Sequence, residues 1–265
     1  MPGSSWLAKP VQFLLRRPAL AIDPEKLALH FGLGRNADAP VHLGTRYDAN
    51  GTFLSDPGNT VVSHLVTGSA TEAVLLDARR RYLGMSDAQS LAFTAPESLH
   101  MTVFQGVLGR RRAPTYWPEG LPLDTPVADV TEVLLQRLEG FAIGPDFAVE
   151  LVQAVPTGLI VEGASDADRK ALAEWRNRFA DLFGYRHPDH ERYQFHITFA
   201  YPINWIADER LAAWAMMLDE VTEDIKARAP VLELRAPAFC AFEDMNFFDE
   251  LLVLEKTTTE PSEAA

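Results

Sequence analysis

Two histidines in this sequence each precede a threonine by two positions inside a β-forming run. The first run reads LHMTVF over residues 99–104, and the second reads FHITFA over residues 195–200. Because side chains alternate along a strand, the His and Thr of each run point to one face, roughly 7 Å apart. The residue between them points the opposite way, into a core. Each strand therefore presents an imidazole and a hydroxyl side by side, and these pairs are His100 with Thr102 and His196 with Thr198.

Two such strands facing each other would form a cleft able to cleave a phosphodiester without a metal ion. One imidazole would deprotonate the attacking water, and the other would protonate the departing sugar oxygen. Histidine suits both roles because its ordinary pKa lies near neutrality. The two hydroxyls would donate hydrogen bonds to the non-bridging phosphate oxygens, where charge sits in the transition state. The sequence leaves open which histidine is the acid and which is the base.

The placement of the two runs carries more weight than the runs themselves. A single His-x-Ser/Thr string is weak, since about one match is expected by chance in a chain with seven histidines. The alternative interpretation is that both histidines are half-buried strand residues bonded to their neighbours. However, the two motifs lie 96 positions apart (196 minus 100), on equivalent strands of an approximate internal duplication.

The duplication is expected to repeat the order strand, helix, strand, helix. The first copy is predicted as strand 60–66, helix 71–83, strand 98–107 and helix 127–141, and the second as strand 158–162, helix 166–183, strand 194–202 and helix 208–228. Further strands are predicted at 147–154, 231–242 and 251–254. Alternating strands and helices usually indicate a parallel sheet, but a two-lobed duplication fits an α+β fold as well.

The regions outside the duplication carry fewer signals. Residues 1–41 are predicted as an N-terminal extension, irregular to residue 22 and then helical over 24–33. Residues 34–59 read as a long loop, which we expect to fold over the cleft as a lid, with Arg46 or Tyr47 meeting a ligand. Residues 42–255 form the predicted two-lobed domain, and residues 256–265 a disordered tail.

Composition narrows the class of partner. The chain has 37 acidic and 24 basic residues and a formal net charge of −13, which disfavours binding to long DNA or RNA but still permits a small anionic ligand. Cys240 is the only cysteine, so no intramolecular disulfide or multi-cysteine zinc site can form, and its apolar neighbours predict a small buried core residue. No apolar run is long enough to span a membrane, and we expect a monomeric cytoplasmic protein.

The paired His-x-Thr strands and their spacing resemble those of the 2H phosphoesterase superfamily, which includes 2′,3′-cyclic nucleotide phosphodiesterases. More narrowly, residues 47–51 (YDANG), 57–60 (PGNT) and 100–104 (HMTVF) are similar to a branch known as DUF1868. The resemblance covers about residues 42–255, and the His-x-Thr pair is its strongest part.

The resemblance implies a fold and a chemistry. The fold is α+β, with two pseudo-symmetric lobes whose antiparallel sheets, flanked by helices, surround a central cleft. The chemistry is metal- and cofactor-independent cleavage of a small nucleotide or RNA-end cyclic phosphate, with His100 and His196 as acid and base and Thr102 and Thr198 as phosphate binders. Physiological substrates vary across the superfamily, so a nucleotide- or phosphate-binding protein without turnover is the alternative.

Six further side chains are candidates for substrate contact. Four lie in the stretch directly after the first His-x-Thr strand, where arginines could neutralise phosphate and aromatic rings could stack on a base. The alternative for this stretch is a solvated loop whose aromatic residues pack onto the lobe; one of its three consecutive arginines pointing inward would suffice. The six candidates are Arg110, Arg112, Tyr116, Trp117, Arg192 and Tyr47.

Three other histidines and one tyrosine have residue types that could also take part in chemistry. His187 and His190 have a superficial metal-ligand spacing, which motivates a metal-dependent hydrolase as a third hypothesis. A solvated turn is favoured instead, because Pro188 disfavours a helix and no third ligand accompanies the two histidines. His64, on the first predicted strand, is a third imidazole without an equivalent in the second copy. Tyr201 is expected in the core, with its hydroxyl at a rim.

Overall fold

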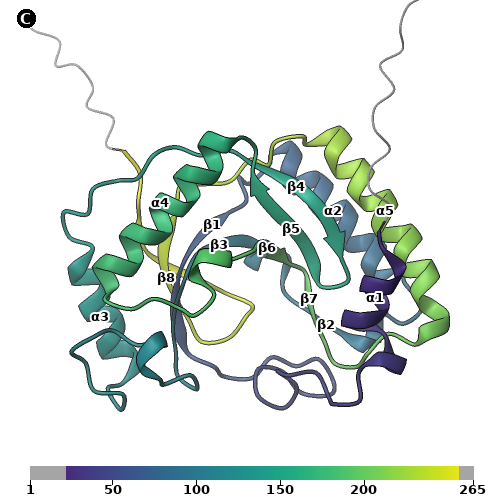
Figure 1. The fold of residues 1–265 in the computed structure, drawn as a ribbon, viewed down its shortest axis with the longest axis horizontal. Coiled ribbons are helices and arrows are strands. Elements are labelled where there is room, and N and C mark those ends of the chain that lie inside the picture. The colour runs from purple at the N-terminus through teal and green to yellow at the C-terminus, as the bar shows by residue number, and fades with distance from the viewer. Residues whose placement is uncertain (1–21, 257–265) are drawn as a thin grey trace, which may run out of the picture.

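The computed structural model describes residues 22–256. The predictions made for residues 1–21 and 257–265 lie outside the described residues. Figure 1 shows the chain from one side. The helices are α1 (Pro24–Phe31), α2 (Ala70–Leu83), α3 (Val127–Arg137), α4 (Asp166–Phe183) and α5 (Leu211–Arg228). The strands are β1 (Gly58–His64), β2 (Leu91–Phe93), β3 (His100–Leu108), β4 (Val149–Val155), β5 (Gly158–Gly163), β6 (Phe195–Thr198), β7 (Ala200–Pro202), β8 (Ala238–Phe242) and β9 (Asp249–Val253).

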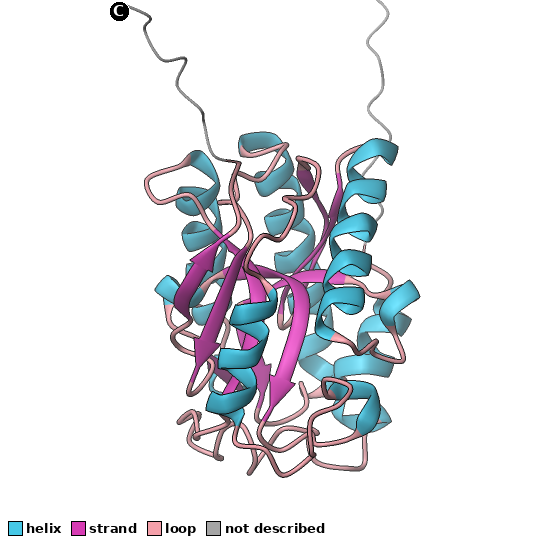
Figure 2. Ribbon diagram, turned by 90° about the vertical axis from the view of Figure 1, so that its left-hand side faces the viewer, coloured by secondary structure: helices cyan, strands magenta, loops and turns pink. Residues whose placement is uncertain are grey.

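Seven strands form one sheet in the order β4-β5-β6-β3-β1-β8-β9, and every neighbouring pair is antiparallel. The two lobes are thus halves of a continuous sheet that meet at the β6–β3 pair. β2 and β7 form a separate two-stranded sheet. The α+β class, the antiparallel pairing and the flanking helices are as predicted. Figure 2 shows the strands side by side with helices packed against them.

The element order follows the predicted duplication, with β1-α2-β3-α3-β4 as the first copy and β5-α4-β6-α5-β8 as the second. The sheet order reveals an exchange between them. β4, the last strand of the first copy, pairs with β5 of the second, while β8, the last strand of the second copy, pairs with β1 of the first. Each half of the sheet therefore contains one strand from the other copy.

Helix α4 illustrates how local sequence sets these elements. Its N-cap, Ser165, accepts a hydrogen bond from the backbone N–H of Asp168, and its C-cap, Gly184, adopts a left-handed conformation at φ 76°. The buried residues recur at helical spacing and pack into the main core beneath the sheet. They include Leu172, Trp175, Phe179 and Phe183.

Two predicted strands differ from the observed ones. The expected strand 194–202 is split at Phe199, because the backbone N–H groups of Phe199 and Ala200 both donate to the carbonyl of Thr157. The chain then leaves the large sheet and pairs with β2 as β7. Within the expected strand 231–242, only Ala238–Phe242 (β8) forms a strand.

A bulge in β3 decides which of its side chains face the cleft. Val61 of β1 pairs with Phe104, but the next residue, Val62, pairs with Thr102. Both Val103 and Phe104 are consequently buried, at 0% and 1% exposure. The extra residue returns Gln105 to the face of Thr102, as β-bulges do when they re-aim a side chain.

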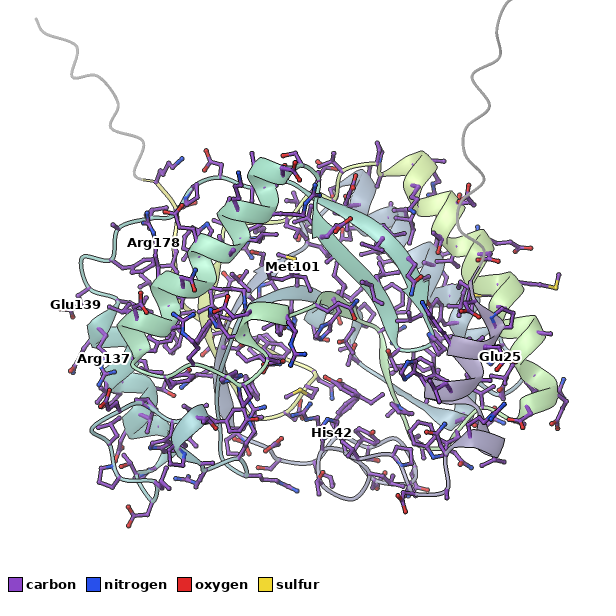
Figure 3. The ribbon with its side chains drawn as sticks, in the orientation of Figure 1. Glu25, His42, Met101, Arg137, Glu139 and Arg178 are labelled. Atoms are coloured by element: carbon purple, nitrogen blue, oxygen red, sulfur yellow. The ribbon has the colours of Figure 1, made fainter. Side chains whose placement is uncertain are left out.

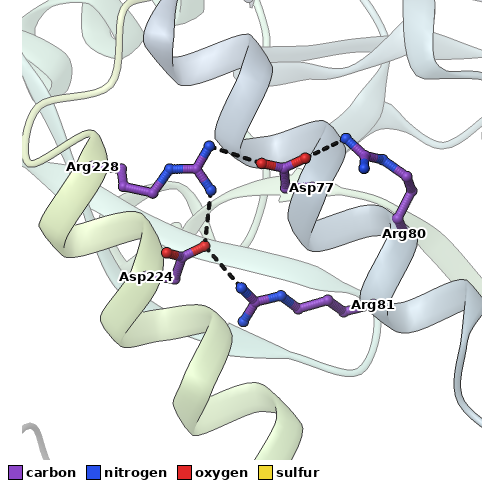
Figure 4. Close-up of polar contacts among 5 residues, drawn as sticks. All are labelled: Asp77, Arg80, Arg81, Asp224 and Arg228. Carbon is purple, nitrogen blue, oxygen red and sulfur yellow. Dashed lines mark hydrogen bonds and ion pairs between the residues drawn. The ribbon is translucent and has the colours of Figure 1, made fainter.

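Helices α2 and α5 pack together and are joined by ion pairs across their surface (Figure 4). Arg228 of α5 reaches Asp77 of α2 at 2.8 Å and Asp224 on its own helix at 3.1 Å. Arg81 of α2 meets Asp224 at 3.1 Å, and Arg80 pairs with Asp77. Arg81 and Arg228 therefore join the two helices, while Arg80 supports Asp77 from the same helix.

A second, smaller apolar cluster lies on the cleft face of the sheet. It comprises Val62, Ala238, Cys240, Met245 and Phe248. The prediction that Cys240 is a buried core residue is confirmed, since it is 0% exposed and burial raises the pKa of its thiol to about 12. Over residues 22–256, no helix is both long and apolar enough to cross a membrane.

Candidate active site

The two His-x-Thr strands are direct neighbours in the sheet. Met101 of β3 pairs with Ile197 of β6 in antiparallel register, and both side chains are fully buried in the core. Because the strands run in opposite directions, the residue before Met101 lies opposite the residue after Ile197. His100 is therefore placed across from Thr198, and Thr102 across from His196. All four side chains line one cavity of about 190 Å³.

Both imidazoles are held in the same way. The Nδ1 atom of His100 lies 2.6 Å from the carbonyl oxygen of Ser98, and Nδ1 of His196 lies 3.1 Å from the carbonyl oxygen of Gln194. Each bond joins the ring to the backbone two residues earlier. A carbonyl can only accept, so Nδ1 carries the proton in both rings. In the neutral form of each ring, Nε2 is then the atom with a free lone pair.

The surroundings of His100 are crowded. Its ring packs edge-on against Phe248 at 4.3 Å between centroids and lies 5.7 Å from the ring of His64. Burial, followed by the charges of His64 and His196, lowers the pKa of His100 to about 3. The ring is therefore neutral across the physiological pH range.

His64 is the cross-strand partner of His100 in the β1–β3 pair. Its Nδ1 lies 2.9 Å from Oε1 of Glu250. The guanidinium of Arg235 donates to both carboxylate oxygens of Glu250, at 2.8 Å to Oε1 and 2.9 Å to Oε2. Burial lowers the pKa of His64, and the carboxylate of Glu250 opposes that shift. His64 supports the ring of His100 from the side and is not one of the cavity-lining residues.

A tyrosine accompanies each threonine. The hydroxyl of Tyr201 interacts with Thr198 and with Arg46, and burial raises the pKa of Tyr201. Tyr201 lines the cavity, in agreement with the predicted position of its hydroxyl at a rim. The hydroxyl of Tyr193 lies near Thr102, and the guanidinium carbon of Arg176 is 3.9 Å from the centre of the Tyr193 ring.

Comparison with known proteins identifies the family and the fold. The family model 2H-phosphodiest, a domain of unknown function (DUF1868), matches residues 46–160, a segment that includes the first His-x-Thr strand. A solved structure of a conserved protein of unknown function from Agrobacterium tumefaciens is 48% identical, with a TM-score of 0.86; the match covers 87% of this chain and 99% of that one. The chain belongs to the DUF1868 branch of the 2H phosphoesterase superfamily. The comparison with curated proteins gives no match.

In this DUF1868 member, three of the six candidate contact residues make hydrogen bonds that stabilise the fold and do not face the cavity. Trp117 is 1% exposed and donates its indole N–H to the carbonyl of Pro122. Arg112 donates to three backbone carbonyls, those of Gly109, Leu123 and Thr125. Tyr47 is fully buried, stacks on Tyr201 at 5.5 Å and donates its hydroxyl to the carbonyl of Pro202. None of the three lines the cavity.

The other three candidates also lie outside the cavity wall. Arg110 is exposed and donates to the carbonyl of Ser55. Tyr116 packs edge-on against His187 at 4.8 Å. Arg192 is exposed and lies on the wall of a separate cavity of about 530 Å³ between α4 and the β5–β6 region. The arginine of the Arg110–Arg112 stretch that does line the cleft is the middle one, Arg111.

The expectation of a solvated turn around His187 and His190 is wrong. They are 5% and 6% exposed, because the turn folds back onto β3 and α4. His187 bonds to Oε1 of Gln105 at 2.9 Å, and His190 bonds to Oδ1 of Asn177 at 3.0 Å. Among the described residues, no group of three or more His, Cys, Asp or Glu side chains is arranged to hold a metal ion.

The loop 34–59 lies at the cavity, as expected for a lid, but only some of its side chains face it. Arg46 and His42 line the cavity, whereas Tyr47 anchors the loop to the body. Sequence reasoning did not find His42, Gln105 or Arg111. Gln105 required knowledge of the β3 bulge, and Arg111 required the conformation of the turn that follows the strand.

Proposed function

We propose that this protein is a phosphodiesterase that uses His100 and His196 as an acid–base pair on a small phosphodiester, a 2′,3′-cyclic nucleotide or an RNA-end cyclic phosphate. The observation that carries the proposal is the antiparallel placement of the two His-x-Thr strands around one cavity. It puts two imidazoles and two hydroxyls on one face, with Nδ1 of each ring fixed by a backbone carbonyl. Neither a metal ion nor a cofactor takes part in the proposed reaction.

The surroundings of the two rings support different roles. We assign His100 as the base, because its depressed pKa keeps Nε2 unprotonated and able to accept a proton. A bound phosphate anion raises that pKa and so strengthens the base as the substrate arrives. The role of acid then falls to His196, on the other strand.

The reaction balances as a hydrolysis. Water attacks phosphorus and gives a proton to Nε2 of His100, while the bond from phosphorus to the ribose oxygen breaks. That oxygen takes a proton from Nε2 of His196. Thr102 and Thr198 donate their hydroxyls to the non-bridging oxygens, where negative charge increases. The product is a nucleotide or RNA end that carries a 2′- or 3′-phosphomonoester, and the two histidines have exchanged protonation states.

The cavity volume and the net charge support a small substrate. A space of about 190 Å³ suits a phosphate with part of its ribose rather than a nucleic-acid strand. A chain with a formal net charge of −13 repels long polyanions, whereas the donors in the cavity act over a few ångströms.

The test is turnover of nucleoside 2′,3′-cyclic phosphates in the presence of EDTA. We expect hydrolysis by the unmodified protein and its loss in His100→Ala and His196→Ala. The matched control is His30→Ala, an exposed histidine on α1, which should retain full rate. Full activity in either active-site variant would overturn the proposal. Binding of the same compounds by calorimetry, with no product after long incubation, would support a binding protein instead.

A further inference from the structure

Arg111 is the observation that goes beyond the two His-x-Thr strands. Its side chain lines the cavity, and its guanidinium carbon sits 4.3 Å from the centre of the Tyr116 ring. Within residues 22–256 the guanidinium forms no ion pair, and its Nε is buried without a hydrogen-bond partner. Stacking on the ring fixes the guanidinium plane, so little side-chain freedom remains to be lost when a ligand binds.

An uncompensated charge in this position costs stability. Burial lowers the pKa of Arg111, and the charge of Asp189 only partly opposes that shift, because no carboxylate among residues 22–256 lies within ion-pair distance of the guanidinium. Proteins normally pair such a charge, because leaving it alone in a partly buried site is unfavourable. In the empty site this unfavourable free energy remains. An anion that binds there neutralises the guanidinium and removes it, so the site is preorganised for an anion.

The neighbouring charges do not supply that anion. Asp56 lies 3.5 Å from Nε of Arg46 and 3.6 Å from Nε of Arg110, so this one carboxylate is shared by two arginines. Arg46 and His42 line the same cavity as Arg111. Burial, followed by the charge of Arg46, lowers the pKa of His42 to about 4, and Arg111 adds to the shift. This end of the cavity is electropositive.

The anion that fits is separate from the scissile phosphodiester. Arg111 follows the far end of β3, and the cavity wall between it and the His100–Thr102 pair includes Gln105 and Leu108. The charge of Arg111 acts on His42 and His187, whereas the charged neighbours of His100 are His64 and His196. The cavity thus has a cleavage end and a cationic end, which is centred on Arg111 and includes the uncharged ring of His42 in its wall. Arg46 contacts the hydroxyl of Tyr201, which also contacts Thr198 of the cleavage end. Figure 3 shows His42 in the loop at the bottom of the view and Met101, between the motif residues of β3, above it near the centre.

We propose that the cationic end binds a second phosphate group of the substrate, so that the preferred substrate is a cyclic phosphodiester carrying a phosphomonoester elsewhere on the same molecule. A planar guanidinium matches the oxygens of a phosphate in a bidentate arrangement. This inference rests on the proposed phosphodiesterase function, whose cleavage end it leaves unchanged.

The experiment compares adenosine 2′,3′-cyclic phosphate with and without a 5′-phosphate. For the unmodified protein we expect the 5′-phosphate to raise kcat/KM by about 10- to 100-fold, mainly through KM. Arg111→Met should lose that advantage, so that its kcat/KM values for the two compounds become equal. Arg210→Met is the matched control, since Arg210 is an exposed arginine at the start of α5, outside the cavity wall, and the preference should survive its removal. Equal kcat/KM for the two compounds in the unmodified protein, or an equal loss for both in Arg111→Met, would overturn the inference.

Binding and stability measurements separate this inference from the proposed function. If the unmodified protein hydrolyses neither compound, the proposed function fails, and calorimetry of the same two compounds decides the inference alone. Tighter binding of the 5′-phosphorylated compound, lost in Arg111→Met, supports the cationic end; equal binding overturns it. Folding should not confound the result, because removing an uncompensated charge should leave Tm unchanged or raise it.

Discussion

Strands β3 and β6 carry the same motif in very different surroundings. β3 has nine residues at the centre of the sheet, whereas β6 has four residues before the chain turns away into β7. The ring of His100 is packed between Phe248 and His64, whereas the aromatic neighbour of His196 is Tyr193, at 6.2 Å. In both rings, nonetheless, Nδ1–H donates to the backbone carbonyl two residues earlier.

The comparison shows that backbone symmetry and chemical symmetry are separate properties. The duplicated strands fix the tautomer of both rings, which depends only on a carbonyl two residues earlier. The packing around each ring comes from elements outside the repeat, such as the segment carrying Phe248. A duplicated pair of histidines can therefore divide into a base and an acid without any difference in the motif itself.

The largest expected effect separates the two histidines by their roles. His100→Ala and His196→Ala should each lower kcat/KM by on the order of 10²- to 10⁴-fold with a cyclic nucleotide. With a p-nitrophenyl phosphodiester, whose leaving group needs no proton, His196→Ala should recover most of its rate and His100→Ala should not. Recovery in His100→Ala alone would reverse the assignment.

The two threonines should be more alike than the two histidines. Thr102→Val and Thr198→Val each remove one hydrogen bond to a non-bridging oxygen, so each should lower kcat by on the order of 100-fold. Serine at either position keeps the hydroxyl and should restore most of the rate. A strong effect at one threonine and none at the other would show that the asymmetry extends to phosphate binding.

The pH profile of kcat/KM tests the depressed pKa of His100. A base must be unprotonated, so the rate falls as pH drops through the pKa of His100 in the free enzyme, which is about 3. At pH 5 the rate should therefore be no lower than at pH 7, provided that circular dichroism shows the protein folded. A base with the ordinary pKa of 6.5 would lose roughly 25-fold over the same interval, and that loss would refute the assignment.

A smaller effect should follow from opening the surroundings of His100. Phe248→Ala removes the ring packed against the imidazole and admits water, so the pKa of His100 should rise toward its ordinary value. The acid limb of the profile should then move to higher pH, with a loss of about threefold or more at pH 5. Val253→Ala, which thins the same apolar cluster from β9, is the control and should leave the limb in place.

Much of the fold could be predicted because local patterns decide it. The β-branched run at Thr60–Val62 predicts β1, and a serine N-cap with a glycine C-cap marks the ends of α2 and α4. The sequence predicts that the two His-x-Thr strands face each other across a cleft; in the structure they lie side by side in one sheet, as the equivalent strands at the boundary between its two halves.

The remaining features depend on contacts that are distant in sequence. The bulge at Val103–Phe104 arises from pairing with β1 and cannot be seen in a run that alternates regularly up to that point. Which of the arginines 110–112 faces the cavity depends on the turn after β3, since all three have the same intrinsic preferences. His187 and His190 lie in a polar turn by composition, and only the packing of that turn against β3 and α4 buries them.

The exchange of strands between the two copies has a consequence for cooperativity. The copies are joined by the β4–β5 hairpin, whose turn consists of Pro156 and Thr157. Each copy on its own would lack the outer part of its half-sheet, which is β4 next to β5 in one half and β8 with β9 next to β1 in the other, and would expose unpaired backbone groups there. The two copies should therefore unfold in a single transition, and fragments separated within this turn should fold only when mixed, so that the catalytic cleft reassembles as a heterodimer.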